Sequence, residues 1–360
     1  MKWSFHLARI AGIDVRIHFT FLLLLAWFGF VYYAEGGQAA VFAGLSFIIL
    51  LFVCVVLHEF GHALAARAYG INTPDITLLP IGGVARLERM PDKPWQELVV
   101  ALAGPAVNVV IAFALYIVIG RFFQVGELEQ IAEGGGNLLT RLLAINVILV
   151  VFNLLPAFPM DGGRVLRALL AMRMKHARAT KIAATVGQIV AVLFGVVGLF
   201  GGNPFLLFIA VFVFFGARGE ASYAVLKEAA DETRVAAIMQ PMGPVLSPGM
   251  NASEAAQLAM AGNSGILPVV DRSLRLLGVV PVDALANALR WDPFVKIDTL
   301  IRRDLPCLGA GATVAEAFAR MREDSQPVFP VTNASGELVG LLDRRDVAVA
   351  LGMLSEGREQ

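Results

Sequence analysis

Residues 50–66 read LLFVCVVLHEFGHALAA, an apolar segment in which three ionisable side chains stand within five residues. Ionisable groups inside a membrane span are costly and therefore indicate function. On a helix, His58 and His62 share one face and can direct ring nitrogens at one metal ion, with Glu59 beside it. A carboxylate in that place can deprotonate a metal-bound water. Histidines satisfied by neighbouring polar groups are the alternative, but inside an apolar span we favour a metal site.

The composition of the whole chain is that of a membrane protein. Of its 360 residues, 57% are hydrophobic and 16% are charged, and the mean hydropathy is +0.70. Soluble domains have about 45–50% and about 25%, respectively. A formal net charge of zero argues against nucleic-acid binding, which needs a basic surface. The two distant cysteines predict neither a disulfide framework nor a cysteine-based zinc site. Six apolar stretches are interpreted as membrane spans: 17–34, 40–66, 96–120, 138–160, 182–200 and 203–218.

Lysine and arginine flank these spans on alternate sides. They precede the first span, lie between the second and third, and follow the fourth and sixth. The connections after the first and fifth spans carry none, and residues 127–133 after the third are acidic. By the positive-inside rule, this distribution places both termini in the cytoplasm. We therefore expect an integral, multi-pass protein of the cytoplasmic membrane of a prokaryote, in contact with the lipid bilayer.

A catalytic zinc usually has three protein ligands, so a third ligand is expected outside the first motif. Asp161 is the strongest candidate. It closes the segment NLLPAFPMDGG at 153–163, where two prolines end a helix and two glycines permit close backbone approach. The predicted topology gives this segment the same depth as the two histidines. A turn residue in Asp-Gly is the alternative for Asp161. The remaining histidines are interpreted as interfacial: His6, His18 and His176.

The two motifs together resemble those of the site-2 protease family of intramembrane zinc metalloproteases. The resemblance covers most of residues 40–200 and includes AGPAVN at 103–108, which is similar to a third family motif. It implies a zinc metalloendopeptidase that hydrolyses a peptide bond within or near a transmembrane segment. Glu59 is then the general base. The implied ligands of one Zn²⁺ per chain are His58, His62 and Asp161.

The same resemblance implies residues that bind substrate. Asn108 and Asn153 would help to hold the substrate strand or the oxyanion, and polar packing between helices is the alternative for Asn108. The β-branched segment 75–87 around Gly82 and Gly83 predicts a short hairpin. In the family a loop at this place contacts substrate; a surface hairpin is the alternative. The implied substrate is a membrane-anchored protein of the anti-sigma or transcription-regulator type, cut in regulated intramembrane proteolysis.

Residues 233–355 contain two similar units that recur about 60 residues apart. ILPVVD at 266–271 corresponds to VFPVT at 328–332, and each unit alternates helical and strand patterns. The two units resemble a tandem pair of cystathionine-β-synthase-type (CBS) domains, an α/β module. The sequence is therefore similar to the subgroup of site-2 proteases that carries such a cytosolic pair.

CBS pairs often bind adenine nucleotides, so the resemblance implies such a ligand in the cleft between the repeats. Asp346 stands at the position that would hold the ribose. Asp343, however, replaces a hydroxyl residue and would repel phosphate. The first repeat has Pro281 and Ala284 at the corresponding places. A structural or dimerising pair, forming a homodimer, is the alternative role.

The expected fold class is a polytopic α-helical membrane protein of about six transmembrane helices with a soluble α/β tandem CBS domain. The membrane metalloprotease domain is placed at 1–220, with a core at about 40–200, and the cytosolic pair at 233–355. The alternative function is a membrane transporter or channel regulated by the CBS pair. A transporter is expected to show repeated halves with broken helices, and the spans of this sequence show no such repeat.

Overall fold

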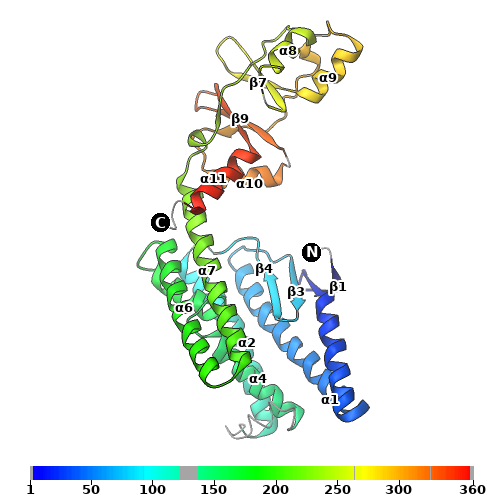
Figure 1. Ribbon diagram of the computed structural model, residues 1–360, viewed down its shortest axis with the longest axis vertical. Helices are drawn as coiled ribbons and strands as arrows, with labels where there is room; N and C mark the ends of the chain where they lie inside the picture. The colour runs from blue at the N-terminus through cyan, green and yellow to red at the C-terminus, as the bar shows by residue number, and fades with distance from the viewer. Residues whose placement is uncertain (1–2, 92, 122–135, 263, 325, 357–360) are drawn as a thin grey trace. The chain divides into compact units, whose positions relative to one another are not determined.

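The computed structural model describes residues 3–91, 93–121, 136–262, 264–324 and 326–356. The chain forms two compact units, Met1–Ala221 and Ser222–Gln360. The first unit contains the long apolar helices and a small sheet (Figure 1). In the second unit, strands and shorter helices alternate.

The longest helix, α1 (Phe19–Arg67), contains the first two predicted spans in 49 residues. Its helical geometry is broken at Gly36 (φ −150°, ψ 17°) and Gly37 (φ +65°, ψ −156°). Glycine adopts such a path without the steric cost that a side chain would impose. Two helical segments therefore meet where the sequence predicts the connection between the spans, and the second segment carries the HEFGH motif.

Three further helices have the length and composition of membrane spans: α2 (Pro94–Ile119), α6 (His176–Phe200) and α7 (Pro204–Glu232). A shorter apolar helix, α4 (Leu138–Asn153), occupies the predicted fourth span. It ends at Asn153 and not at residue 160, because the prolines that follow cannot continue a helix. With α1 counted as two segments, the described chain has six apolar helical segments. The predicted polytopic helical class is confirmed.

A four-stranded sheet accompanies these helices, in the order β1 (Ser4–Ile10), β2 (Ile13–His18), β3 (Asp75–Leu79) and β4 (Gly82–Arg86). β2 and β3 are parallel, whereas β1–β2 and β3–β4 are antiparallel. Ile13 and Ile76 of the sheet pack with Phe60 and Ala63 of α1. The predicted hairpin at 75–87 is thus present as β3–β4, and the sheet is anchored beside the HEFGH motif.

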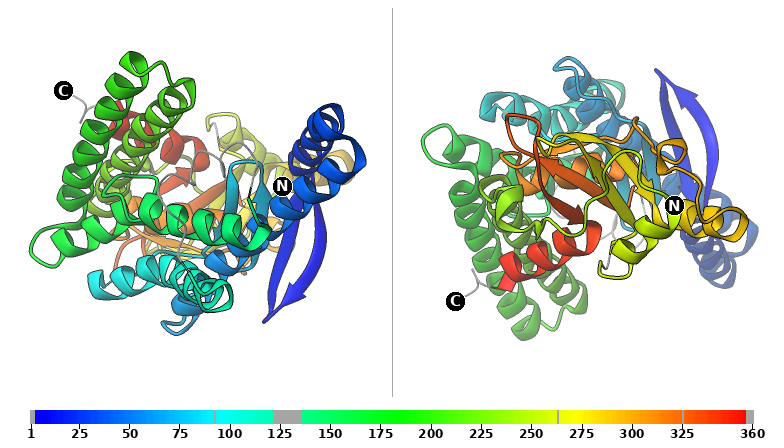
Figure 2. Two further views of the ribbon diagram at one scale, coloured as in Figure 1. Left: turned by 90° about the horizontal axis from the view of Figure 1, so that it is seen from below. Right: turned by 90° about the horizontal axis from the view of Figure 1, so that it is seen from above.

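After the proline-containing loop, the chain forms a short helix, α5 (Asp161–Ala171), before α6. Asp161 therefore begins a helix and does not end one. Figures 1 and 2 show α6 and α7 side by side. A Cβ on Gly198 of α6 would lie 3.0 Å from the Leu207 main-chain nitrogen of α7, so the two helices are in close contact near their connection.

The second unit contains the predicted repeat. The first repeat consists of α8 (Ala252–Ala259), β6 (Ile266–Val270), β7 (Leu276–Pro281) and α9 (Val282–Trp291). The second consists of α10 (Val314–Glu323), β9 (Val328–Thr332), β10 (Leu338–Asp343) and α11 (Arg344–Glu356). Short elements accompany them: η1 (Val235–Ala237), β5 (Gln240–Pro241), η2 (Ile297–Thr299) and β8 (Leu308–Gly309). Each repeat has its own apolar cluster. The predicted α/β class is confirmed.

Candidate metal centre

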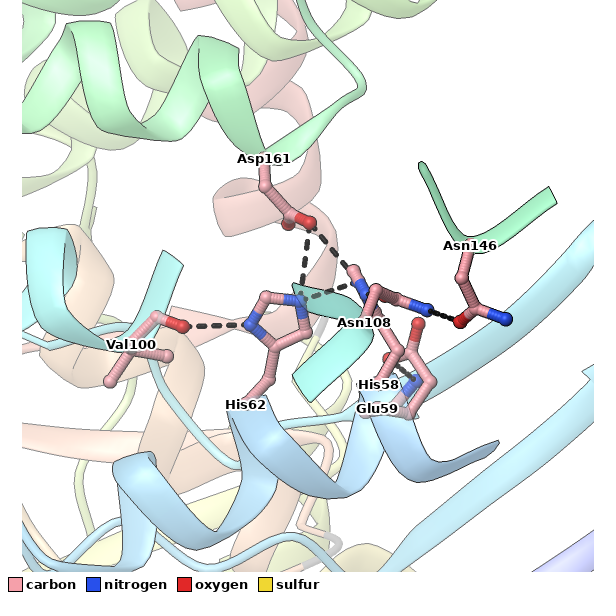
Figure 3. A network of polar contacts seen from close by, with 8 residues as sticks. His58, Glu59, His62, Val100, Asn108, Asn146 and Asp161 are labelled. Carbon is pink, nitrogen blue, oxygen red and sulfur yellow. Dashed lines mark hydrogen bonds and ion pairs between the residues drawn. The ribbon is translucent and has the colours of Figure 1, made fainter. Parts of the chain in front are cut away.

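Three ligand-type side chains from distant parts of the sequence meet inside the first unit (Figure 3). His58 and His62 come from α1, and Asp161 is the first residue of α5. The two histidine Nε2 atoms lie 3.0 Å apart, and each lies 3.2 Å from Asp161 Oδ2. All three residues are buried, with at most 7% of their surface exposed. One atom from each side chain can therefore bind a single ion.

The other ring nitrogen of each histidine is held by the protein. His62 Nδ1 lies 2.7 Å from the main-chain carbonyl oxygen of Val100. A carbonyl oxygen only accepts, so Nδ1 carries the proton and donates it. His58 Nδ1 lies 2.5 Å from the Asn108 side-chain oxygen. Such contacts fix the tautomer of a metal-binding histidine and leave the lone pair of Nε2 for the metal.

A chain of hydrogen bonds sets the orientation of Asn108. Asn146 Nδ2 donates to the main-chain carbonyl oxygen of Leu142 over 2.8 Å, which turns Asn146 Oδ1 toward α2. Asn108 Nδ2 donates to this oxygen over 2.8 Å, so Asn108 Oδ1 must face His58 and accept from it. Both asparagines are fully buried. The main chain of α4 thus determines, through two amides, which nitrogen of His58 is available.

This arrangement fits a zinc ion. Two imidazole nitrogens and one carboxylate oxygen converge within 3.0–3.2 Å of one another, and their lone pairs repel unless a proton or a metal ion lies between them. A tetrahedral zinc ion with bonds of about 2.0–2.1 Å separates its ligands by about 3.3 Å. Three N/O ligands with a fourth position open to water are the pattern of catalytic zinc.

Helix α2 comes very close to both imidazoles at Gly104. A Cβ at this position would lie 2.2 Å from His62 Nε2 and 2.7 Å from His58 Nε2. Only a residue without a side chain leaves room for the two nitrogens to converge. Gly104 belongs to the AGPAVN segment that the sequence singled out, but its part in the site follows from the packing of α1 on α2 and was not predicted.

Glu59 lies between α1 and the β3–β4 hairpin. Its Oε2 accepts a hydrogen bond of 3.2 Å from the Ala85 main-chain N–H, and the residue is partly exposed. Gly83 lies directly against it, because a Cβ on Gly83 would be 2.8 Å from Glu59 Cγ. The carboxylate next to His58 is therefore in contact with the last strand of the sheet.

The other residues predicted for the site have different surroundings. Asn153 is the partly buried last residue of α4. Gly82 begins β4 with φ +136° and has open space where a Cβ would stand. In the second unit, Asp346 accepts from the Asp343 main-chain N–H at 2.9 Å and from the Gln240 amide at 3.0 and 3.1 Å. The carboxylate predicted to bind ribose is thus occupied by contacts within the chain.

Besides Gly104, two residues that hydrogen-bond within the cluster were not identified from the sequence. Asn146 has a visible signal, because it is an amide in an otherwise apolar span, where polar side chains usually bond between helices. Val100 acts through its main-chain carbonyl oxygen, and the side-chain pattern carries no signal for such a role.

Comparisons with known proteins cover both units. Peptidase family M50 matches residues 46–136 and 123–194, and the CBS domain matches residues 235–290 and 297–352. The zinc metalloprotease MJ0392 of Methanocaldococcus jannaschii is 32% identical over 354 residues, which are 98% of this chain and 98% of that protein. The protein sll0528 of Synechocystis sp. is 30% identical over 321 residues, 86% of this chain and 83% of its own length. The solved structure of the site-2 protease from Methanocaldococcus jannaschii is 38% identical, covers 61% of this chain and 95% of that chain, and gives a TM-score of 0.46.

The similarity to MJ0392 extends over both the candidate metal centre and the CBS pair. A transporter that carries a CBS pair would share only the C-terminal unit with such a relative, so the transporter alternative has no support. The cluster of two histidines and one aspartate has the donor set that a zinc peptidase needs. The chain therefore belongs to peptidase family M50, the site-2 proteases, and is a membrane-embedded zinc metalloprotease with a tandem CBS pair.

Proposed function

We propose that the protein cuts a membrane-anchored protein within or near its transmembrane segment, with His58, His62 and Asp161 as the zinc ligands and Glu59 as the general base. The observation that carries the proposal is the convergence of three buried ligand atoms within 3.2 Å of one another. The chemistry that zinc supplies in such a site is polarisation of a carbonyl group and activation of water at neutral pH.

Glu59 is suited to move protons during the reaction. Ala85 anchors its Oε2, whereas Oε1 has no hydrogen bond from any residue that the structure describes. Oε1 can therefore take a proton from the attacking water and return it to the departing amine, as a general base and then a general acid. The anchor keeps the carboxylate in one orientation for both transfers.

The two asparagines have separate roles in this proposal. Both polar atoms of the Asn108 carboxamide are engaged by His58 and Asn146. We therefore assign Asn108 to the orientation of His58, in place of the contact with substrate or oxyanion that the family resemblance implied. Asn153 keeps the proposed role at the substrate, because it is partly exposed at the end of α4 and heads the segment that leads to Asp161.

An extended substrate is proposed to bind along the outer edge of β4. β4 is the last strand of the sheet, and its Ala85 N–H points away from β3 to Glu59. Gly83 pairs with Leu78, and Ala85, two residues further along β4, pairs with Ile76. In an antiparallel pair such positions point their main-chain groups to the same edge.

A substrate strand at this edge would gain the partners that an unwound segment needs. A helix that opens inside lipid exposes N–H and C=O groups that must be bonded again, and addition of a strand to a sheet edge provides such bonds. Gly82 and Gly83 have no side chains that would block the approach. They remain the proposed substrate contacts in the hairpin.

The orientation in the membrane is also a proposal. Alternate basic connections support cytoplasmic termini in a prokaryotic cytoplasmic membrane, with a membrane domain at 1–220 and a cytosolic CBS pair at 233–355. The division of the chain between Ala221 and Ser222 is consistent with these boundaries. Labelling of cysteines introduced at Arg173 and Gly202 by an impermeant reagent tests the orientation: only the second should react from outside intact cells.

For the CBS pair we propose a regulatory or dimerising role without strong nucleotide binding. Asp343 Oδ1 accepts from the Arg345 main-chain N–H over 2.8 Å, and Asp346 accepts from the Asp343 N–H. The two carboxylates therefore form a reciprocal cap at the start of α11. Asp343, although paired with the exposed Arg345 (Nε–Oδ1 3.6 Å), puts a carboxylate in place of a hydroxyl group, which disfavours phosphate there.

The central experiment combines metal analysis with cleavage of candidate substrates by the purified protein. Membrane-anchored regulators, such as anti-sigma factors, are reconstituted with wild type and with Glu59→Gln. The variant should keep one zinc per chain, because all three ligands remain, and should lose cleavage by about 10²–10⁴-fold. A Glu59→Gln protein that cuts at the wild-type rate would refute the assignment of the base.

A further inference from the structure

Helix α7 lies on the segment that leads to Asp161. A Cβ on Gly216 would be 2.7 Å from Pro159 Cδ and 3.1 Å from its Cγ, so the helix main chain rests on the proline ring. The neighbouring Ala217 is fully buried in an apolar cluster with Phe158. Phe158 and Pro159 stand just before Asp161 in the chain. A displacement of α7 near Gly216 would therefore press on or release the loop that precedes Asp161.

The same face of α7 also contacts the helix that Asp161 begins. Glu220 is one turn beyond Gly216, and its Oε2 accepts from Arg167 Nη1 over 3.2 Å. Arg167 is on α5, with a side chain that is only 5% exposed. Positions 216 and 220 lie on one side of a helix. α7 thus holds Asp161 from both directions, through the loop before it and through the helix after it.

A second bond ties Arg167 to the helix that orients the histidines. Arg167 Nε donates to Glu97 Oε1 over 2.7 Å, and Glu97 is 3% exposed on α2. The guanidinium carbon of Arg167 lies 5.1 Å from the centre of the Phe158 ring. α2 also carries Val100, the partner of His62. Arg167 therefore links α5 to both α2 and α7.

The two halves of the candidate metal site stand on different elements. The histidines stand on α1 and are oriented by α2 and α4, whereas Asp161 stands on α5. Its distance from the histidines is set by whatever holds α5 in place. Metal sites are sensitive to such support, because loss of one group that orients a ligand commonly lowers metal affinity 10–100-fold.

We propose that α7 positions Asp161 for metal binding, through Gly216 and Glu220. This inference rests on the proposed function, in which Asp161 is the third zinc ligand. Gly216 and Glu220 are positioning residues, since neither contacts the metal cluster. α7 continues to Glu232, beyond the first unit, so the helix that supports the third ligand is also the one that leads into the CBS pair.

A pair of glycine substitutions on α7 tests the proposal. Gly216→Ala places a methyl group against the ring of Pro159, whereas Gly219→Ala meets nothing within 4 Å and serves as the matched control. Zinc affinity is measured on the full-length protein in detergent by competition with a chelator. We expect Gly216→Ala to weaken zinc binding about tenfold or more and Gly219→Ala to bind as the wild type does. Equal affinities in the two variants would overturn the proposal.

The ion pair is tested with Glu220→Ala and Glu220→Gln. The side chain of Glu220 is 32% exposed, so both proteins should fold even if Gly216→Ala does not. Glu220→Ala should weaken zinc binding about tenfold, and Glu220→Gln should recover most of the affinity because its amide oxygen can still accept from Arg167. Wild-type affinity in Glu220→Ala would count against the proposal.

Cobalt(II) absorption separates a change in the site from a general loss of stability. The d–d bands of cobalt bound in place of zinc should shift in Gly216→Ala. The metal-free variant should unfold at about the same temperature as the metal-free wild type, so that the spectral shift is not explained by a loss of stability. Asp161→Asn identifies the level at which a failure occurs. If Asp161→Asn keeps wild-type zinc affinity, the proposed ligand set is wrong. If it loses zinc while both α7 variants keep it, only the role of α7 is wrong.

Discussion

Gly104 of α2 lies against the imidazole of His62, so that a β-carbon at position 104 would come within 2.2 Å of Nε2. The same atom would be 2.7 Å from His58 Nε2. Gly104 and the two histidines belong to long helices, α2 and α1, whose main chains cannot easily move apart. The candidate metal centre therefore depends on a position that supplies no ligand and no charge.

Gly104→Ala should abolish binding of the single zinc ion that each chain is expected to hold. The added methyl group would occupy the place where the two nitrogens converge, so at least one imidazole must turn away. We expect a loss of activity of at least about 10²-fold. Metal content by mass spectrometry measures the effect, with the exposed Leu102→Ala on the same helix as control. Full zinc occupancy in Gly104→Ala would contradict the observed packing.

Asn108→Leu should lower zinc affinity about 10–100-fold, because His58 loses the acceptor that fixes its tautomer. Asn146→Ala should have a smaller effect in the same direction, since it acts one hydrogen bond further away. Chelator competition measures both. If Asn108→Leu binds zinc normally but fails to cut, Asn108 acts on the substrate, as the family resemblance implied.

Removal of residues 233–360 should leave a folded, zinc-binding membrane domain whose cleavage is altered but not abolished. All groups of the metal cluster and the β3–β4 hairpin lie in the first unit. The rate is compared on one substrate reconstituted with the full-length and truncated proteins at equal zinc content. A truncated protein that holds zinc and cuts nothing would show that the pair is part of the catalytic assembly.

ATP should bind weakly to the full-length protein, because Asp343 puts a carboxylate where phosphate would bind and the Asp346 carboxylate is engaged by Gln240 and the Asp343 N–H. Asp343→Thr removes one charge and keeps a side chain that can cap the helix. We expect this variant to bind ATP several-fold more tightly. Isothermal titration calorimetry in detergent compares the two. Tight binding by the wild type would mean that the nucleotide uses other residues.

Cys307 should react slowly with iodoacetamide near neutral pH. Although Cys307 is exposed, desolvation by the surrounding chain raises the pKa of its thiol, and the Arg320 guanidinium opposes this only in part. The thiolate is the reactive form, so a raised pKa lowers the reactive fraction at a given pH. The rate of alkylation should increase with pH, and this increase should occur at higher pH in the folded protein than for the same cysteine in the unfolded chain. Peptide mapping distinguishes it from the buried Cys54. A faster reaction in the folded protein would contradict the direction of the shift.

Much of this protein was predictable from local patterns. The membrane class follows from the length of the apolar stretches, and the pairing of His58 with His62 follows from the helical repeat that puts i and i+4 on one face. The α/β repeat follows from alternating patterns within residues 233–355. Each of these inferences needs only residues that are near one another in the sequence, or a pattern that occurs twice.

The tertiary structure alone decided what surrounds the candidate ligands. Gly104 is defined by its distance from helix α1, Asn108 by an amide on α4, and Glu220 by a guanidinium on α5. These partners are separated by tens of residues, and no periodicity relates them. The reason is physical: a side chain's chemistry and its helical face are local properties, whereas orientation, exclusion of a methyl group and support of a ligand arise only when separate helices pack together.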